Sequence, residues 1–524
     1  MFRDRVDYMV DELALCQDAL NQNGYLAAFP SVAFDSLEGT STDSGGVVVP
    51  YYTVHKIMAG LLDAYRYLGN QMAFDVAIKM ADYFHRRLTG LSADTLERIF
   101  RTDGSGNPQN EFGAMSDPLS ELYDITGEQK YLDAASMFNR SWFMVPLASG
   151  EDRLEGLHAN THVAEALGIA HTANLSDDET SLAASDNFWR LITEHHSFVI
   201  GGNSVHEWLD KSDVEVGPSI DGGKTLPPTT AESCNSHNML KLTSTLFERT
   251  PKMEYADYFE RTLYNHILAS MSPVSGEMTY FTPLRGHFRT YMNGTYCCTG
   301  TGIENTPRYN EGIYFFKENA VWVNLFIPSQ FNWEEAGITM KQEGNGGAGE
   351  DVTITIIGSD ADTPNTIFLR IPFWVSSGVT LSVNGNLLAE SPDASAYFPI
   401  TRIWKTGDVI ALTLPASLRL ERAKDDNSMV AIFYGPLLFA GELGADGMPN
   451  DFTDKDAYLD AEPVSVPDIV VGDTDPSTWL EASEGSNLTY TAGNAGPATG
   501  LVFRPLYEVH HQRYSVYWKL QESK

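Results

Sequence analysis

The chain has 524 residues, of which 43% are hydrophobic and 20% charged, and its formal net charge at pH 7 is −35. Such a charge repels nucleic acid and anionic membranes, so we expect neither as a partner. No segment approaches the roughly 18 consecutive apolar residues of a membrane-spanning helix. The first ten residues, MFRDRVDYMV, carry charges where a signal peptide would be apolar. As written, the sequence predicts a folded cytoplasmic protein with a large core.

Residues up to about 315 show the three- and four-residue apolar spacing of amphipathic helices. The clearest segments are 57–69, 72–88, 119–127, 130–142, 179–196, 238–248 and 254–271. Two stretches repeat a helix, a turn centred on Gly69 or Gly127, and a second helix; a third hairpin turns at Thr250-Pro251. Repeated hairpins predict a toroid or solenoid of helices. We count about nine or ten helices, whereas a closed ring of six hairpins needs about twelve.

From about residue 316 the apolar period becomes two, which predicts strands. The segments with this pattern are 320–329, 351–359, 366–375, 379–386, 409–422, 429–443 and 513–520. The sequence VNGN at 383–386 predicts a hairpin turn. We therefore expect a helical domain over 1–315 and a β-sandwich region of one or two modules over 316–524.

The cysteines of the chain are Cys16, Cys234, Cys297 and Cys298. Four cysteines are too few for a disulfide scaffold, and adjacent cysteines seldom bond to each other because the ring would strain the peptide. The adjacent pair therefore indicates metal binding or thiol chemistry. Cys16 falls on an apolar helix face, so we expect it to pack in the core.

The strongest motif joins two distant segments, TTAESCNSHNMLKLT (229–243) and TYCCTGTGIEN (295–305). We expect Glu232 and Cys234 at the start of a helix and the cysteine pair in a Gly/Thr-rich loop. Three sulfurs and one carboxylate oxygen form a tetrahedral donor set for Zn²⁺. A catalytic zinc, a structural zinc that holds the loop to the helix, and buried cysteines without metal are the alternatives. His237 is expected to be a helix residue one turn beyond Cys234 rather than a further ligand.

A second candidate is Glu207, which follows a Gly-Gly turn and precedes Trp208 in FVIGGNSVHEWL (198–209). Apolar surroundings would raise the pKa of this carboxyl toward the value that a general acid needs. The alternative is a salt-bridged surface glutamate.

Further polar residues are candidates for substrate binding, because helix hairpins that face a central cavity often bind a sugar through such side chains. The histidines among them are His55, His158, His162 and His206, and the carboxylates are Glu111, Asp117 and Glu304. Each histidine has a structural alternative, as a buried side chain with its hydrogen bonds satisfied. Each carboxylate is near a predicted helix start, where capping the helix is the alternative to binding a ligand.

Several of these motifs together resemble the zinc-dependent cysteine glycosidases, the retaining β-L-arabinofuranosidases of glycoside hydrolase families 127 and 146. The motifs are GGNSVHEW, AESCNSHNMLKLT, YCCTGTGIEN, YTVHKIMAGLLDAY, GLHANTH and IFYGPLLFAGELG, and the similarity extends from about Arg5 to RYSVYWK. The resemblance implies a multidomain fold of helices and strands, an (α/α)6 barrel followed by β-sandwich domains. It implies the release of L-arabinofuranose or a related furanoside from an oligosaccharide or glycoside, with Zn²⁺ as cofactor.

The resemblance also implies roles for single residues. The implied zinc ligands are Glu232, Cys234, Cys297 and Cys298. Cys297 matches the nucleophile of the family, and Glu207 matches its acid/base. The candidates for substrate binding are His158 and His206, which match positions lining the sugar pocket, together with His55 and Glu304.

Relatives usually carry further helices before the segment that matches RVDYMVDELALCQ, in agreement with the low helix count. We therefore expect a barrel without its first helices, with exposed apolar surface that a second copy of the chain would cover. Relatives often act outside the cytoplasm, so a periplasmic or secreted location is the alternative if the chain is truncated at its N-terminus.

Two other functions remain open from the residues alone. A metal-free glycosidase or lyase would pair Glu207 with Glu111 or Asp117 and would tolerate a chelator. A non-catalytic carbohydrate-binding protein with a structural zinc would bind arabinofuranosides without turnover.

Overall fold

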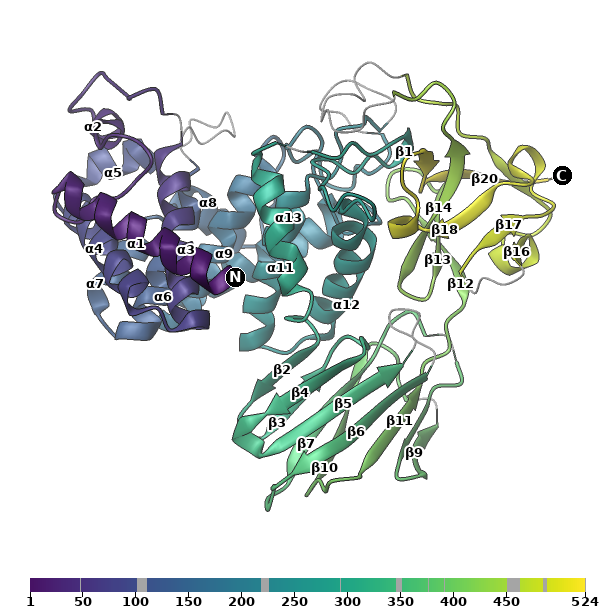
Figure 1. The fold of residues 1–524 in the computed structure, drawn as a ribbon. Coiled ribbons are helices and arrows are strands. Elements are labelled where there is room, and N and C mark those ends of the chain that lie inside the picture. The colour runs from purple at the N-terminus through teal and green to yellow at the C-terminus, as the bar shows by residue number, and fades with distance from the viewer. Residues whose placement is uncertain are drawn as a thin grey trace. The chain divides into compact units, whose positions relative to one another are not determined.

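The computed structural model describes residues 1–47, 49–100, 111–217, 226–292, 294–344, 351–375, 377–390, 392–449, 462–483 and 488–523. The chain forms two compact units, residues 1–191 and 192–524 (Figure 1). Within the described ranges, no helix combines the length and the apolarity that crossing a bilayer requires.

The first unit is helical. Its helices are α1 (Phe2–Leu20), α2 (Val32–Glu38), α3 (Pro50–Leu68), α4 (Gln71–Thr89), α5 (Ala93–Phe100), α6 (Ser116–Thr126), α7 (Gln129–Ser136), α8 (Ser141–Ala148), α9 (Ala159–Ser176) and α10 (Glu179–Leu191). Helices α3 and α6 end at Gly69 and Gly127, whose φ angles of 69° and 68° are left-handed. Glycine adopts this conformation without the steric cost of a Cβ, so each helix stops there and its neighbour folds back. The two hairpins predicted around these glycines are confirmed.

Aromatic rings fill the core of the first unit. Tyr51 packs edge-on against Phe34 and Phe138, with ring centroids 4.9 and 5.3 Å away. Cys16, which was expected in this core, is exposed instead. Helix α1 buries Val10 and Gln17, and the Gln17 amide donates to the carbonyl of Val76. A glutamine therefore takes the inward position beside the cysteine, which the apolar pattern could not indicate.

The α-helices in the described part of the second unit precede most of its strands. They are α11 (Ser233–Arg249), α12 (Met253–Thr262) and α13 (Cys297–Arg308). The turn expected at Thr250 is confirmed, but the continuous helix expected over 254–271 is interrupted. A wider π-helical turn, Leu263–Ile267, follows α12 directly, and such turns are frequent near functional sites.

The adjacent cysteines were expected in a loop, and that expectation is wrong because they open α13. Gly300 and Gly302 lower the helix propensity of this segment, but tertiary packing favours the helix. A Cβ at Gly302 would lie 2.3 Å from Cγ of Met278, so the helix packs closely against the segment before it.

The described residues contain thirteen α-helices, more than the nine or ten counted from the sequence. Three that the apolar spacing did not single out, α2, α5 and α8, have only seven or eight residues. Helices of two turns are too short to produce a clear apolar period.

Strands make up most of the rest of the second unit. The strands of the first two sheets are β2 (Tyr314–Lys317), β3 (Ala320–Val323), β4 (Ser329–Trp333), β5 (Ile338–Gly344), β6 (Asp351–Ser359), β7 (Asn365–Ile371), β8 (Thr380–Val383), β9 (Asn386–Glu390), β10 (Ala396–Arg402) and β11 (Val409–Thr413). They form a four-stranded sheet, β10-β7-β3-β2, and a six-stranded sheet, β4-β5-β6-β11-β8-β9. Inward residues of both sheets share one hydrophobic core, as in a β-sandwich.

A third sheet has ten strands and includes one that lies far upstream in the sequence. Its strands are β1 (Arg285–His287), β12 (Leu418–Arg422), β13 (Met429–Tyr434), β14 (Leu437–Gly444), β15 (Ile469–Val471), β16 (Leu480–Ala482), β17 (Tyr490–Ala492), β18 (Val502–Pro505), β19 (Arg513–Ser515) and β20 (Trp518–Glu522). Strand β1 pairs with β19, which ties the segment before α13 to the C-terminal sheet.

The change from helices to strands near residue 316 is confirmed, since α13 ends at Arg308 and β2 begins at Tyr314. The hairpin expected at 383–386 joins β8 to β9 and is also confirmed. The assignment of 1–315 and 316–524 as domains stays a prediction.

A buried ion pair joins α12 to the sandwich. Arg370 on β7 has no exposed surface, and its guanidinium donates to Glu260 and to Asp257 on α12. The Trp374 indole donates to the second oxygen of Glu260 at 2.8 Å. The buried Glu260 carboxylate has the Arg370 guanidinium as its cationic partner, so removing either one leaves the other without that compensation.

We predict that Arg370→Met lowers the free energy of unfolding by about 3–5 kcal/mol, because the Glu260 carboxylate stays buried without its cation. Adding Glu260→Gln should recover part of that loss, since the neutral amide can still accept from Trp374. Urea unfolding of the intact chain measures both effects. If the loss in the double variant equals the sum of the losses in Arg370→Met and Glu260→Gln alone, the two residues are not coupled and the interpretation is wrong.

Candidate active site

Two helices of the second unit begin at the same place. Cys234 lies in the first turn of α11, Glu232 is the residue that precedes this helix, and Cys297 and Cys298 open α13. Their carboxylate oxygen and three sulfurs all lie within 4.8 Å of one another. Across the described part of the chain, this is the one group of three or more His, Cys, Asp and Glu side chains close enough to share a metal ion. The structure therefore brings together the four residues that the sequence singled out.

The three sulfurs are in close contact. The sulfurs of Cys234 and Cys298 are 3.1 Å apart, and those of Cys297 and Cys298 are 4.0 Å apart. Oε1 of Glu232 lies 3.6 Å from Cys298 Sγ. The Thr301 hydroxyl lies 3.1 Å from Cys234 Sγ and donates to the Cys297 carbonyl. Thiolates with one carboxylate are the donors that a thiophilic divalent ion prefers, so this group could hold a metal.

The three thiols differ in exposure and in acidity. Cys234 and Cys298 are buried, and burial raises the pKa of both. Cys297 is exposed, and the hydrogen bonds that it shares with Cys234 and Cys298 lower its pKa. It is also the first residue of α13, where the positive end of the helix dipole stabilises a thiolate. The sulfur that solvent can reach is therefore the one that ionises most readily.

The Tyr280 hydroxyl connects Cys297 to Glu207. It donates a short hydrogen bond to Oε1 of Glu207 and lies 3.7 Å from Cys297 Sγ. Burial raises the pKa of Tyr280, and the negative charges of Glu232 and the two adjacent cysteines raise it further, so the phenol keeps its proton. Because an O–H···O bond is about 2.7 Å long, the Cys297 sulfur and the Glu207 oxygen are no more than about 6.4 Å apart.

Backbone pairing brings these side chains together. The segment around Val205 pairs with Thr230, and the N–H of Thr282 donates to the Thr230 carbonyl at 3.0 Å. The N–H of Ser233 donates to the carbonyl of Tyr280, also at 3.0 Å. Three separate segments, carrying Glu207, Glu232 and Tyr280, are thus hydrogen-bonded side by side.

The turn that carries Glu207 is strained. Ser204, His206 and Glu207 have left-handed φ angles of 79°, 49° and 71°. Non-glycine residues adopt this region at a cost and cluster there at functional sites. Two contacts with Thr229 fix His206, the residue before Glu207. The His206 N–H donates to the Thr229 carbonyl, and Nε2 of His206 lies 3.3 Å from the Thr229 hydroxyl.

Glu304 lies on α13 but outside the donor group. Its carboxylate pairs with Arg308 at 2.8 Å and lies 3.6 Å from Nε2 of His237. Nδ1 of His237 is 2.8 Å from Asn305, so the histidine links α11 to α13. The expectation that His237 is a helix residue rather than a ligand agrees with this geometry.

The remaining candidates belong to the first unit and form local hydrogen bonds there. His158 caps α9 by accepting from the N–H of Thr161, and Nδ1 of His55 is 3.0 Å from the Tyr52 carbonyl. Burial holds the pKa of His162 well below its usual range. The Asp117 carboxylate bonds the His171 ring at 3.0 Å, and Glu111 has a left-handed φ of 45°. Sugar binding by His55 and His158 stays a prediction.

Sequence reasoning missed Tyr280. It is one of 24 tyrosines, and MTYFTP, the segment around it, has no spacing or composition that indicates a site. Only the pairing of its backbone with Ser233 brings it between Cys297 and Glu207.

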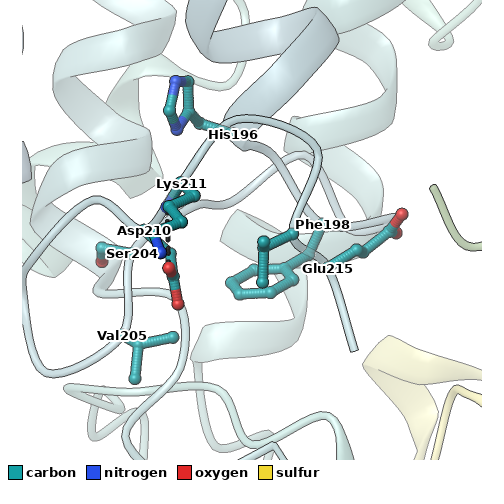
Figure 2. A pocket seen from close by; sticks show the side chains of 8 residues that line it. His196, Phe198, Ser204, Val205, Asp210, Lys211 and Glu215 are labelled. Carbon is teal, nitrogen blue, oxygen red and sulfur yellow. Dashed lines mark hydrogen bonds between the residues drawn. The ribbon is translucent and has the colours of Figure 1, made fainter. Parts of the chain in front are cut away.

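A pocket opens beside the turn that carries Glu207 (Figure 2). Its lining residues are His196, Phe198, Ser204, Val205, Asp210, Lys211, Val214 and Glu215. Neither Glu207 nor any of the four donors lines it. This pocket therefore lies beside the turn that carries Glu207 and is separate from the candidate site.

Family models match nearly the whole chain. Residues 1–311 match the model of the beta-L-arabinofuranosidase GH127 catalytic domain, and residues 320–416 match that of the GH127 middle domain. Residues 419–520 match a domain of unknown function. The chain belongs to glycoside hydrolase family 127, as the motifs indicated.

Individual relatives agree with this assignment. A non-reducing end beta-L-arabinofuranosidase of Bifidobacterium longum is 26% identical over 431 residues, which cover 71% of this chain and 62% of that protein. A GH127 beta-L-arabinofuranosidase from Geobacillus stearothermophilus has a similar fold, with a TM-score of 0.72 at 19% identity over 99% of this chain and 86% of its own. A solved structure described as a glycoside hydrolase has the same TM-score at 17% identity, covering 98% and 88%. These likenesses support the predicted fold, a helical barrel with β-sandwich domains.

One buried histidine contacts the first turn of α11. Nδ1 of His266, in the π-helical turn after α12, lies 2.7 Å from the hydroxyl of Ser236 on α11. Burial lowers the pKa of His266 to about 3. Since a histidine in an unfolded chain has a pKa of about 6.5, only the unfolded state binds the proton between these values.

We therefore predict that the free energy of unfolding falls as the pH drops from about 6.5 toward 3, by up to about 1.4 kcal/mol per pH unit from this group. Urea unfolding at pH 7 and pH 5.5 measures this dependence. The variant His266→Gln should show a shallower dependence than the native chain. Equal dependence in both proteins would contradict the assignment.

Proposed function

We propose that the protein is a retaining glycoside hydrolase that releases L-arabinofuranose, or a related furanoside, from glycans. In this proposal Cys297 is the nucleophile and Glu207 the acid/base. The observation that supports it most is the contact of both residues with one phenol, that of Tyr280. A double displacement requires a nucleophile and a proton-carrying group that flank one scissile bond. A reactive sulfur and a carboxyl meet that requirement.

We further propose that the metal is Zn²⁺, held by Glu232, Cys234, Cys297 and Cys298. The donor set fits, because zinc accepts four ligands of sulfur and carboxylate oxygen in a tetrahedral arrangement. When bound, the ion keeps its thiol ligands deprotonated and lowers the cost of expelling a sulfur from carbon.

The first step is the displacement of the aglycone. Cys297 Sγ attacks the anomeric carbon, so that a C–S bond forms while the glycosidic C–O bond breaks. The Glu207 carboxyl gives its proton to the departing oxygen. Tyr280 keeps its own proton and donates a hydrogen bond to the Glu207 carboxylate that remains, which holds that group in place for the second step.

The second step is hydrolysis of the sugar–sulfur bond. Glu207 takes a proton from water, the water oxygen attacks the anomeric carbon, and the C–S bond breaks to restore the Cys297 thiolate. Two inversions at one carbon give net retention. The separation of at most about 6.4 Å between sulfur and carboxylate supports this course, because inverting enzymes keep their two groups about 6.5–9.5 Å apart to admit a water molecule.

The net charge of −35 also suits a neutral substrate. An uncharged furanoside avoids the repulsion that a polyanionic glycan would meet.

We predict that Cys297→Ser lowers kcat by at least about 10⁴-fold, because a serine hydroxyl is not ionised at neutral pH. Glu207→Gln should lower kcat/KM by about 10²–10⁴-fold for aglycones that need a proton to leave. Hydrolysis of aryl and alkyl β-L-arabinofuranosides measures both. Near-normal kcat in Cys297→Ser would contradict the nucleophile assignment.

We also predict about one zinc per chain and loss of activity on chelation, which a metal-free carboxylate pair would tolerate. Cys234→Ser should lower the zinc content, measured by elemental analysis of the purified chain. Cys16→Ser is the matched control, since Cys16 is exposed on α1 and should leave the zinc content unchanged. Full activity in the metal-free protein would contradict the proposed role.

A further inference from the structure

Residues 197–217, here called the Glu207 loop, are bonded at both ends to residues from the region 419–520, which matches a domain of unknown function. At the start of the loop, the Val199 N–H donates to the Tyr517 hydroxyl at 3.0 Å. The Lys424 ammonium donates to the Ser197 carbonyl at 2.8 Å.

The same region holds the end of the loop. The Tyr517 hydroxyl donates to Oε1 of Glu215, and the Lys424 N–H donates to Oε2 of the same carboxylate at 2.9 Å. The Asp425 carboxylate accepts from the N–H of Glu215 and from those of the next two residues. One hydroxyl, that of Tyr517, thus bonds the loop on both sides of Glu207.

The two bonds of the Tyr517 hydroxyl are buried. Tyr517 has no exposed surface and Glu215 is 3% exposed. Figure 2 shows the Glu215 carboxylate pointing away from Ser204 and Asp210. If the hydroxyl were absent, solvent could not replace its bonds, so a buried N–H and a buried carboxylate oxygen would each lose a partner.

We propose that the region 419–520 fixes the Glu207 loop and that Tyr517 is a positioning residue for Glu207. The inference rests on the proposed function of Glu207 as acid/base. Its physical reason is the strain inside the loop, where Ser204, His206 and Glu207 have left-handed φ angles. Such a conformation persists only when the surrounding structure enforces it, and the bonds to Tyr517, Lys424 and Asp425 provide that constraint.

Tyr517→Phe tests this role, because it removes the hydroxyl and keeps the ring. For an alkyl or sugar aglycone, whose departure needs the Glu207 proton, kcat/KM should fall about 10- to 100-fold. For an activated aryl aglycone, which leaves without the Glu207 proton, kcat/KM should stay at the native value. Its kcat and KM should fall together, because the second step still needs Glu207 as base. Zinc content should not change. The control is Tyr397→Phe, which loses a hydrogen bond to Asn324 in the sandwich and should alter neither substrate's kinetics.

Hydrogen–deuterium exchange of the intact chain gives a second readout that does not depend on activity. Tyr517→Phe should raise exchange in residues 197–217, and Tyr397→Phe should not. If exchange rises there but the native chain hydrolyses no furanoside, the positioning role stands and the proposed function fails. Unchanged exchange in the loop, or an equal loss of kcat/KM for both aglycones, would overturn the inference.

Discussion

The site depends on the meeting of two helix N-termini. Helices α11 and α13 come from distant parts of the sequence, yet their first turns place three sulfurs and a carboxylate within 4.8 Å of one another. As three thiolates and a carboxylate, these groups would repel each other at this distance. The positive ends of two helix dipoles reduce that repulsion, and a bound divalent ion would remove most of it. The close packing of Gly302 against Met278 and the contact of His237 with Asn305 hold α13 in this position.

A second constraint is the backbone pairing around Thr230. It carries Glu207 on one side and Tyr280 on the other, so the acid/base candidate and the exposed sulfur meet at one phenol oxygen. The pairing leaves the Glu207 turn in an unfavourable conformation. The C-terminal β region, through Tyr517, supplies bonds that hold that turn at both ends. Residues that never contact the donor group thereby fix the geometry of the proposed chemistry.

Much of this could be predicted from local sequence. The turn glycines Gly69 and Gly127 and the switch of apolar period near 316 predicted the element types, because each depends on short-range physics. The donor group was predictable because adjacent cysteines and the spacing of Glu232 and Cys234 are chemically distinctive. Long-range features were not predictable. The helix that begins at Cys297 depends on tertiary packing that outweighs the low helix propensity of Gly300 and Gly302. Tyr280 and Tyr517 reach the site through pairings that no spacing in the sequence encodes.

The central claim is that the sulfur of Cys297 becomes bonded to the sugar. The most direct measurement is mass spectrometry of the protein quenched during turnover of an activated aryl β-L-arabinofuranoside and then digested. We expect one pentosyl group on the peptide that contains Cys297, and a first product of retained anomeric configuration. A pentosyl group on a peptide that bears only carboxylates, or a first product of inverted configuration, would contradict the account.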